Sequence, residues 1–374
     1  MKKILHIIDN MGDGGAQRVV LDYLEHKSSL HKYELACLSL SCPTNSEYDK
    51  YIKIQNLPVS YLEYKRSEAK IAIVRKLLNW IRRTNAIRVF IKVNNVDAIH
   101  THMTGIFYYM ILIFFIFHGE KFHTMHADPY RISRKLVLIS RFVFRYLDVH
   151  PIAVSEDQRK KAMRRYGLSH CDLVRNGVDI IGIKKYVGNL DKKTLRKKYG
   201  IPVQGIVIGS VGRLHFIKNF DLLIKIFDAY KKHSSDDVYL AIVGNGPEEG
   251  NLKKLIFELG VVNNVFLIGN LAHKEVYEFY KMIDIFMLLS QYESSSIVTL
   301  EAQAVGVRCL LSNSIPADVV YKHNVRRMDV SLGISEWCAA IQDNEYINRD
   351  VYDENTNDFS TVIHSLEYIY NKYF

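Results

Sequence analysis

The sequence has few cysteines, and none of them stands at the spacing of a metal centre or a redox motif. The five are scattered, with no C-x-x-C and no pair at the spacing of zinc ligands. We therefore exclude a zinc module and a disulfide framework, and interpret the thiols as reduced side chains of a cytosolic protein. The cysteines are Cys37, Cys42, Cys171, Cys309 and Cys338.

Long apolar runs are also missing. The almost wholly apolar stretch 106–118 is about a dozen residues long, whereas a helix that spans a bilayer needs about 20. It suits either a buried helix packed on a sheet or a helix with one face dipped into a membrane surface. Residues 1–10 are short, strand-like and followed by a polar loop, so they do not resemble a signal peptide.

What the chain does have is enough material for two folded cores. It contains 374 residues, of which 48% are hydrophobic and 24% charged, and this favours two domains of ordinary size. Its net charge of +10 favours an anionic partner. A nucleotide, a nucleic acid and an acidic membrane surface all fit that charge.

Short apolar runs alternate with helical patterns, and the alternation restarts after residue 204. Strands that alternate with helices predict parallel sheets with helices on both faces, so we expect an α/β protein with two doubly wound domains. The expected strands are 3–8, 33–40, 60–62, 98–100, 152–154, 205–211, 239–243, 265–268, 285–289 and 309–311, and the expected helices include 18–25, 71–93 and 220–232.

The domains are expected at residues 1–180 and 190–358, with the boundary between them in the lysine-rich stretch from residue 180 to residue 203. An amphipathic helix at 359–374 is expected to pack back on the first domain. Doubly wound domains bind ligands at the carboxyl ends of their strands, so the motifs that follow strands carry the functional signal.

The first such motif follows the strand at 205–211. Arg213 comes directly after Gly212, and Lys218 stands five residues further on, where a helix begins. A diphosphate needs this arrangement, because the cations offset its charge while N–H groups at the helix start bind its oxygens. Taken alone, both residues could equally be ordinary surface cations.

Two more motifs follow later strands. Residues 243–247, Val-Gly-Asn-Gly-Pro, carry two glycines that let the backbone approach a ligand closely or simply form a turn. Glu293 and Glu301 stand eight residues apart around a run of serines. A carboxylate can accept two hydroxyl hydrogens, so Glu301 suits a ribose diol and Glu293 a sugar. The serines would present N–H groups to a phosphate at the helix start.

The order of these motifs resembles the family 4 glycosyltransferases. Gly-Arg-Leu-x-x-x-Lys-Asn at 212–219, then Val-Gly-x-Gly-Pro, then two glutamates eight apart are similar to that family's signatures. In the N-terminal half, Gly14 to Arg18 (GGAQR) is similar to its glycine-rich acceptor loop and Ile99 to His102 (IHTH) to its strand ending in His-x-His. Further similar stretches are Ala153 to Glu156 and Asn176 to Asp179.

The resemblance implies the GT-B architecture, in which two Rossmann-like, doubly wound domains face a cleft. It also implies that Arg213 and Lys218 bind the donor diphosphate and that Glu301 binds the ribose. The implied catalytic residues are His102, Arg213, Lys218 and Glu293, and the implied acceptor side includes Gln17 and His126. The implied donor site comprises Gly14, Gly15, Gly212, Arg213, Lys218, Gly244, Asn245, Gly246, Pro247, Glu293, Ser295, Ser296, Ile297 and Glu301.

The implied reaction is retaining transfer of a hexosyl or N-acetylhexosaminyl group from a nucleotide-diphosphate sugar, UDP-linked, to a saccharide or polyprenyl-diphosphate-linked saccharide. Residues 312–316 and Glu336-Trp337 are similar to enzymes of bacterial exopolysaccharide or capsule assembly. The chain has no Asp-x-Asp, with which glycosyltransferases commonly hold a metal–diphosphate, so we expect no metal or cofactor. His123 and His126, two further candidates at the cleft edge, lack a carboxylate that would complete a metal site.

Two departures from the family pattern leave an alternative open. Glu293-Ser294-Ser295 stands where the family has Glu-Gly-Phe, and Gln17 where it has an acidic residue. The chain could therefore be a non-catalytic nucleotide-sugar-binding subunit that supports a partner enzyme, or an epimerase acting on the donor. A nicotinamide dehydrogenase fits less, because Gln17 occupies the third small position after Gly12-Asp13-Gly14.

A cluster of cations lies on a predicted helix at residues 159–165. It is either a solvated face or a surface that attracts anionic lipid or a lipid-diphosphate acceptor. Nucleic acid is not an expected partner, because no aromatic side chains interleave with these cations. We expect a cytoplasmic protein in peripheral contact with the inner face of the plasma membrane.

Overall fold

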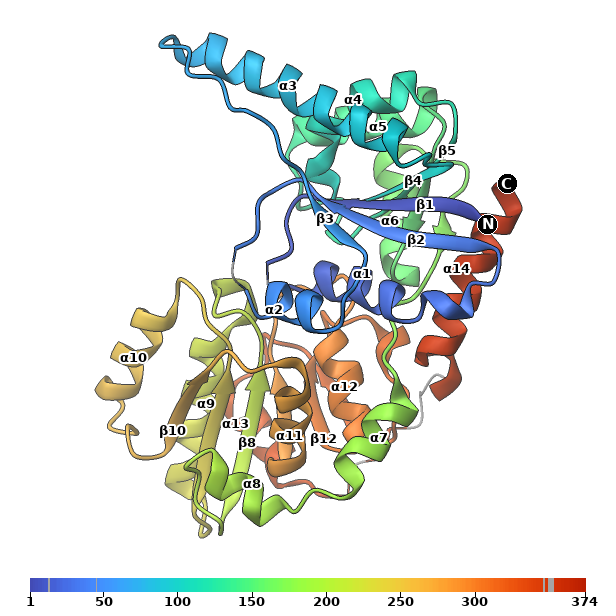
Figure 1. Cartoon of the computed structure of the whole chain (residues 1–374). Coiled ribbons are helices and arrows are strands. Elements are labelled where there is room, and N and C mark those ends of the chain that lie inside the picture. The colour runs from blue at the N-terminus through green and yellow to red at the C-terminus, as the bar shows by residue number, and fades with distance from the viewer. Residues whose placement is uncertain (13, 45, 346, 349–352) are drawn as a thin grey trace. The chain divides into compact units, whose positions relative to one another are not determined.

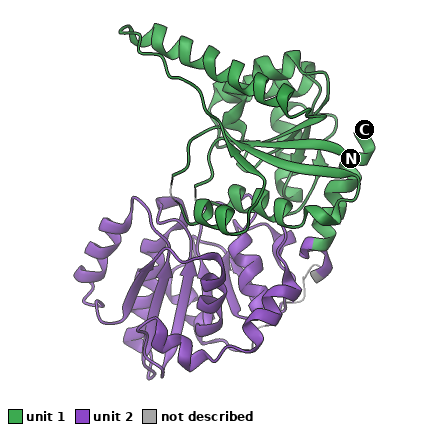
Figure 2. Cartoon of the chain, in the orientation of Figure 1, with its two compact units in different colours: residues 1–176, 360–374 green, residues 177–359 purple. Residues whose placement is uncertain are grey.

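The computed structural model describes residues 1–12, 14–44, 46–345, 347–348 and 353–374 (Figure 1). The chain divides into two compact units (Figure 2). Unit 1 consists of residues 1–176 and 360–374, and unit 2 of residues 177–359. The C-terminal helix therefore belongs to the unit that contains the N-terminus.

Unit 1 is built on a seven-stranded parallel sheet with the strand order β3-β2-β1-β4-β5-β6-β7. Its central strands are almost fully buried, as parallel strands with helices on both faces must be. In the register of β1 and β4, His6 lies opposite His100. The strands are β1 (Lys2–Ile8), β2 (Tyr33–Ser39), β3 (Val59–Tyr61), β4 (Ala98–His102), β5 (Glu120–Thr124), β6 (Val149–Ala153) and β7 (Asp172–Leu173).

Helices cover both faces of this sheet. One face packs against α3, α4 and α5, whose inward side chains include Ile87, Phe107 and Val143. The other face receives Tyr23 of α1 and Tyr370 of α14, both of which contact histidine rings of the sheet. The helices of unit 1 are α1 (Gly15–Glu25), α2 (Glu47–Ile54), α3 (Ala72–Val93), α4 (Phe107–Ile116), α5 (Arg134–Tyr146), α6 (Glu156–Tyr166) and most of α14 (Phe359–Tyr373).

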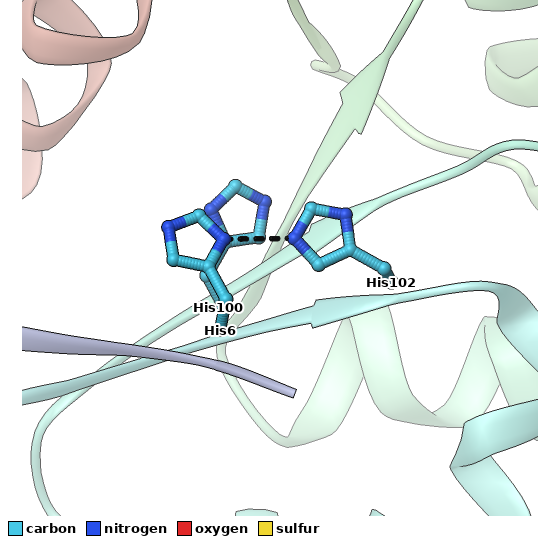
Figure 3. A group of neighbouring side chains, drawn as sticks. All are labelled: His6, His100 and His102. Atoms are coloured by element: carbon cyan, nitrogen blue, oxygen red, sulfur yellow. Dashed lines mark hydrogen bonds between the residues drawn. The ribbon is translucent and has the colours of Figure 1, made fainter. Parts of the chain in front are cut away.

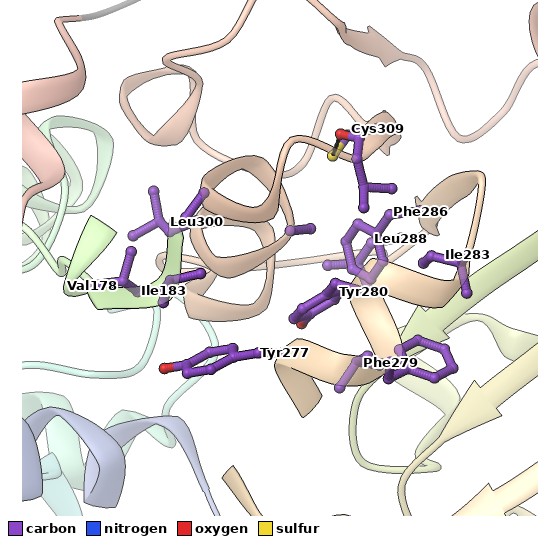
Figure 4. Packing of buried hydrophobic residues seen from close by; sticks show 14 of the residues in the cluster. Val178, Ile183, Tyr277, Phe279, Tyr280, Ile283, Phe286, Leu288, Leu300 and Cys309 are labelled. Atoms are coloured by element: carbon purple, nitrogen blue, oxygen red, sulfur yellow. Dashed lines mark hydrogen bonds between the residues drawn. The ribbon is translucent and has the colours of Figure 1, made fainter. Parts of the chain in front are cut away.

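Unit 2 repeats the plan with a six-stranded parallel sheet in the order β10-β9-β8-β11-β12-β13. Tyr280, Phe286 and Leu300 belong to the core on one face of the sheet (Figure 4), and Trp337 to the core on the other. The strands are β8 (Ile206–Val211), β9 (Val238–Val243), β10 (Val265–Gly269), β11 (Ile285–Leu288), β12 (Arg308–Ser312) and β13 (Val325–Met328). The helices are α7 (Ile180–Gly188), α8 (Lys192–Lys198), α9 (Phe220–His233), α10 (Glu249–Glu258), α11 (His273–Met282), α12 (Ile297–Val305) and α13 (Ile334–Gln342).

The predicted α/β class, with two Rossmann-like doubly wound domains, is confirmed. The stretch from residue 180 to residue 203, in which the domain boundary was expected, contains α7 and α8 of unit 2. Its sparse apolar residues are enough to anchor both helices, because Ile183, Val187 and Leu195 are buried in the core. Strands β5, β7 and β13 were not predicted. Their sequences are short or rich in charge, so their strand character depends on the neighbours with which they pair.

Candidate functional site

In unit 2, the loop after β8 carries the two predicted cations. Arg213 is exposed, and no described carboxylate forms an ion pair with it. Lys218 ends a short 3₁₀ helix, η3 (Phe216–Lys218), immediately before α9. Its ammonium lies 2.5 Å from a carboxylate oxygen of Glu293. Only 22% of the Lys218 side chain and 11% of the Glu293 side chain are exposed, so the pair is partly shielded from water.

Neighbouring strands explain why these two residues meet. Strands β8 and β11 are adjacent in the sheet, so the loops at their carboxyl ends lie side by side. The backbone N–H of Gln291 donates to the carbonyl of Ile217 at 2.8 Å, which joins the two loops directly. Ser290 Oγ donates to Glu293 Oε1 at 2.8 Å and holds the carboxylate toward Lys218. The predicted diphosphate cation and the predicted sugar carboxylate thus share one site.

The glycines after β9 serve close packing between loops. Gly244 has φ +130°, and a Cβ added there would lie 2.0 Å from the carbonyl oxygen of Gly212. A Cβ added at Gly246 would lie 2.2 Å from the carbonyl oxygen of Leu214. The close approach found here is therefore to the loop that carries Arg213. The exposed Asn245 and Pro247 lie on the same loop.

The start of α12 has the features of an anion site. Its N-cap residue, Ser296, makes no side-chain cap, because Ser296 Oγ instead accepts from Thr299 Oγ1 at 2.8 Å. The first turn from Ile297 contains no acidic residue. Ser295 Oγ is buried and has no hydrogen-bond partner among the described residues. Uncapped N–H groups at a helix start attract an anion such as a phosphate.

Glu301 lies further along α12 and is only 4% exposed. Tyr280 donates its hydroxyl hydrogen to Glu301 Oε2 at 3.2 Å, and His273 Nε2 lies 3.3 Å from Oε1. Burial and the adjacent carboxylate raise the pKa of Tyr280 well above its usual value. Both partners come from α11 and were not predicted, because only the packing of α11 against α12 brings them to Glu301.

A surface pocket adjoins η3. Its lining includes His215, Asn219, Glu248 and Gln291. Asn219 has φ +59°, a left-handed conformation that asparagine tolerates better than most residues. The Lys-Asn pair of the sequence motif is thus explained by backbone geometry as well as by charge. The other lining residues were not singled out in the sequence.

In unit 1, the predicted histidines form a hydrogen-bonded chain. His102 has no exposed surface, and one of its ring nitrogens lies 3.0 Å from His126 Nε2. Its other ring nitrogen lies 2.9 Å from His6 Nδ1 (Figure 3). His126 is half-buried. His126 is therefore the member of this pair that reaches the surface, and His102 stands behind it.

This chain of hydrogen bonds continues from the His6 ring to Tyr370 of the C-terminal helix α14. His6 Nε2 lies 3.4 Å from the Tyr370 hydroxyl, which lies 2.7 Å from His100 Nδ1. Burial lowers the pKa of His6 to about 3 and that of His126 to about 4. Burial and the neighbouring imidazoles hold the pKa values of His100 and His102 well below their usual range. A neutral imidazole has one donor and one acceptor, so the bonds along the chain must all point the same way.

The rings of His6, His100 and His102 also offer nitrogens within 4.8 Å of one another, a set that could hold a metal ion. Five of the six ring nitrogens take part in the contacts described above, and the sixth, His100 Nε2, lies 2.7 Å from Thr124 Oγ1. Every one of these nitrogens therefore already has a hydrogen-bond partner. A metal ion would have to break most of this network.

His123 does not lie at an edge of the unit, contrary to the sequence-based expectation. It is fully buried, its ring centroid lies 4.3 Å from that of Phe107, and Nδ1 lies 2.9 Å from Thr101 Oγ1. Alternate residues of a strand point to opposite faces, so His123 on β5 faces away from the side where Thr124 meets His100.

The glycine-rich loop leads into α1, with Gly14 as N-cap and Gly15 as first residue. Gln17 is only 7% exposed, and its amide donates to the carbonyl and side-chain oxygens of Asn10, each at 3.2 Å. Gln17 therefore closes its own loop, and its contact with an acceptor stays a prediction. Asp13 lies outside the described residues.

The cation cluster on α6 is partly neutralised by its own helix. Lys161 lies 2.6 Å from Asp157, and Arg159 lies 3.6 Å from Glu156. Across the described part of the chain, no helix is both long enough and apolar enough to cross a membrane. The stretch 106–118 forms α4, which buries one face against the sheet and exposes Phe115 on the other.

Comparison with known proteins gives concordant matches. A family model described as "Glycosyltransferase Family 4" matches residues 13–180, and one described as "Glycosyl transferases group 1" matches residues 191–332. The "Putative glycosyltransferase EpsF" of Bacillus subtilis is 24% identical over 356 residues, covering 91% of this chain and 87% of the relative. The O-antigen biosynthesis glycosyltransferase WclY of Escherichia coli is 31% identical over 122 residues, 33% of each protein.

Solved structures share the architecture of the whole chain. Anabaena HepE in complex with UDP matches with a TM-score of 0.77 at 17% identity, over 100% of both chains. Sucrose-phosphate synthase of Thermosynechococcus elongatus matches with a TM-score of 0.75 at 14% identity, over 99% of both. At these identities the likeness shows the fold, which is GT-B.

Proposed function

Since the chain belongs to the family 4 glycosyltransferases, we propose that it transfers a hexosyl or N-acetylhexosaminyl group from a UDP-linked donor. The acceptor is a saccharide or a polyprenyl-diphosphate-linked saccharide, and the transfer retains the configuration at the anomeric carbon. The observation that carries this proposal is the convergence of Lys218, Glu293 and the uncapped start of α12 at the ends of neighbouring strands. That convergence offers charge for a diphosphate beside a carboxylate for a sugar.

In the proposed reaction, the bond between the anomeric carbon and the diphosphate oxygen breaks and a bond to the acceptor oxygen forms. The acceptor's proton passes to the departing diphosphate. Arg213 and Lys218 stabilise the charge that develops on the leaving group, together with N–H groups near Ser296. Leaving and entering oxygens share one face of the sugar, so no protein nucleophile is needed.

The donor would be held at both ends. Glu301 would accept hydrogens from a ribose diol. Its contacts with Tyr280 and His273 support this role, because they fix the orientation of the carboxylate. Glu293 would exchange part of its contact with Lys218 for hydroxyl groups of the sugar. Lys218 would then be available to the diphosphate. The two cations supply the positive charge, so the proposed reaction is metal-independent.

A role in bacterial surface polysaccharide synthesis is part of the proposal. It is supported by the resemblance to exopolysaccharide and capsule enzymes and by the match to an O-antigen biosynthesis glycosyltransferase. Peripheral contact with an anionic membrane belongs to the same proposal, because a polyprenyl-linked acceptor resides in the bilayer.

The test is an assay of pure protein with labelled nucleotide sugars, with and without saccharide acceptors. Release of nucleoside diphosphate that requires an acceptor, with a product whose anomeric configuration matches the donor, supports the proposal. Binding of a nucleotide sugar without turnover across the acceptor panel would favour the non-catalytic subunit. A changed sugar in the absence of acceptor would favour an epimerase.

A further inference from the structure

The outer surface of three helices in unit 1 has an unusual charge composition. Helices α3, α4 and α5 together contain 45 residues, among them ten Lys or Arg and no Asp or Glu. The whole chain has 40 acidic residues in 374, so a stretch of this size would ordinarily carry about five. The ten cations are Arg75, Lys76, Arg82, Arg83, Arg88, Lys92, Arg134, Lys135, Arg141 and Arg145.

These cations remain largely free of carboxylates. Among the described residues, Arg83 is the one of the ten that forms an ion pair, with Asp9 at 3.2 Å. The other predicted basic surface, on α6, differs in this respect, because Lys161 and Arg159 are paired with carboxylates of the same helix. Helices α3 and α5 therefore carry cations whose charge is mostly not offset by an ion pair with a carboxylate.

Large apolar side chains are exposed on the same helices. On α4, Phe115 is 74% exposed, and on α5, Leu138 is 64% exposed. On α3, Ile73 is 79% and Leu77 is 55% exposed, one helical turn apart. The buried faces of α4, α5 and the second half of α3 pack on one side of the sheet, so Phe115 and Leu138 lie on the outer side of this layer. Ile73 and Leu77 lie on the first half of α3. Scattered exposed apolar residues are ordinary, but a cluster of this kind marks a binding surface.

The first half of α3 projects from the body of unit 1 (Figures 1 and 2). Every residue of 72–77 is exposed, although the segment reads Ala-Ile-Val-Arg-Lys-Leu. Further along, Trp80 Nε1 donates to the carbonyl of Tyr108 at 2.7 Å and fixes α3 on α4. Residues 72–77, the tip of α3, thus form a projecting helical segment that carries both cations and apolar side chains. The second half of the helix anchors this tip to α4.

We infer that the outer face of α3, α4 and α5 docks onto a bilayer that contains anionic lipid. Apolar side chains such as Ile73, Leu77 and Phe115 enter the boundary between head groups and acyl chains, while the lysines and arginines beside them contact lipid phosphates. A protein partner with an acidic surface would satisfy the cations but would not require apolar side chains on a projecting tip. The inference deepens the acceptor part of the proposed function, on which it rests.

The test is sedimentation of the full chain with vesicles of phosphatidylcholine, with or without phosphatidylglycerol. The wild type is expected to bind only the anionic vesicles and to be released by salt. Arg75→Glu/Lys76→Glu is expected to bind at least about 30-fold more weakly, since each lost cation contributes about a five-fold factor and the two new carboxylates add repulsion. Ile73→Ser/Leu77→Ser is expected to weaken binding in a way that low salt does not restore.

Lys160→Glu/Arg164→Glu is the matched control, because it makes the same charge change on exposed positions of α6. It is expected to bind within a few-fold of wild type. Equal loss in the α3 and α6 variants, or no preference of wild type for anionic vesicles, would overturn the inference. Transfer to a soluble acceptor should be unchanged in every variant, so a failure of docking and a failure of the proposed reaction are told apart.

Discussion

At the scale of single residues, Lys218 and Glu293 are the most informative pair. They stand 75 positions apart, yet their side chains meet at 2.5 Å at the end of the unit 2 sheet. A lysine placed to neutralise a diphosphate would ordinarily be strongly hydrated. Its contact with Glu293 instead holds the ammonium in one place, and in the proposed reaction the lysine exchanges this contact for the diphosphate.

Replacing this lysine tests the donor site directly. Lys218→Ala is expected to lower kcat by about 100- to 1,000-fold, because it removes a cation that stabilises the leaving diphosphate. Lys225→Ala on α9 is the matched control, since Lys225 is exposed and contacts only Asp221 at 3.5 Å. Steady-state kinetics with a nucleotide-sugar donor provide the measurement. Full activity in Lys218→Ala would remove this residue from the site.

The histidine–tyrosine chain of unit 1 makes a prediction about proton positions. Tyr370→Phe deletes the hydroxyl that joins His6 to His100, so the two halves of the chain no longer need to point the same way. Nitrogen NMR of the imidazoles is expected to show one tautomer at His6 in the wild type and a mixture in the variant. Tyr373→Phe is the control, because its hydroxyl donates to Asp172 outside the chain. An unchanged tautomer in Tyr370→Phe would contradict the linkage.

The same rings predict how stability depends on pH. Burial lowers the pKa of His6 from 6.5 to about 3, so the unfolded chain binds a proton that the folded chain excludes. Stability is then fully present above pH 6.5 and falls as the pH drops toward about 3, by up to about 1.4 kcal/mol per pH unit for each such histidine. Urea denaturation between pH 7 and pH 5 measures this, and stability that is flat or rises on acidification would refute it.

At the scale of elements, the loops after β8 and β9 behave as one packed unit. The N–H of Leu214 donates to the carbonyl of Asn245 at 2.9 Å, and Gly246 lies against the backbone of Leu214. The two glycines of the Val-Gly-Asn-Gly-Pro stretch thus have a steric cause, because the backbone of the neighbouring loop leaves no room for a Cβ. Without those glycines, Arg213 and Lys218 could not keep their positions.

Gly246→Ala is therefore expected to weaken donor binding by about 10-fold or more and to lower the melting temperature, because its Cβ would lie 2.2 Å from a backbone oxygen. Gly250→Ala on α10 is the control. Its Cβ would meet no atom within 4 Å, and alanine favours a helix over glycine. Thermal unfolding with and without UDP measures both effects. Equal behaviour of the two variants would contradict the packing argument.

At the scale of the whole molecule, the proposed metal independence can be tested. The six ring nitrogens of His6, His100 and His102 are already hydrogen-bonded. In the proposed reaction, Arg213 and Lys218 offset the charge of the diphosphate. Protein treated with a chelator is expected to keep its transfer activity and to contain no stoichiometric metal by elemental analysis. Activity that is lost on chelation and restored by a divalent ion would reverse this conclusion.

Much of the architecture could be predicted from the sequence, because its signals are local. Apolar runs bounded by glycine, as at 206–211, form buried parallel strands wherever helices cover both faces. Motifs after such strands come together at one edge of a sheet, which is why Lys218 and Glu293 could be assigned to a common site. The glycine–cation order was enough to recognise the family.

What the sequence by itself determined is the fold class, the family and the residues that face the carboxyl ends of the unit 2 strands. Only the tertiary structure decided which partners those residues have: Tyr280 and His273 for Glu301, Tyr370 for the histidines, and a shared acid-free face for α3, α4 and α5. The physical reason is that periodicity and turn chemistry act between neighbours in the chain. Hydrogen bonds between helices, and charge gathered from separate helices, depend on distances that only packing sets.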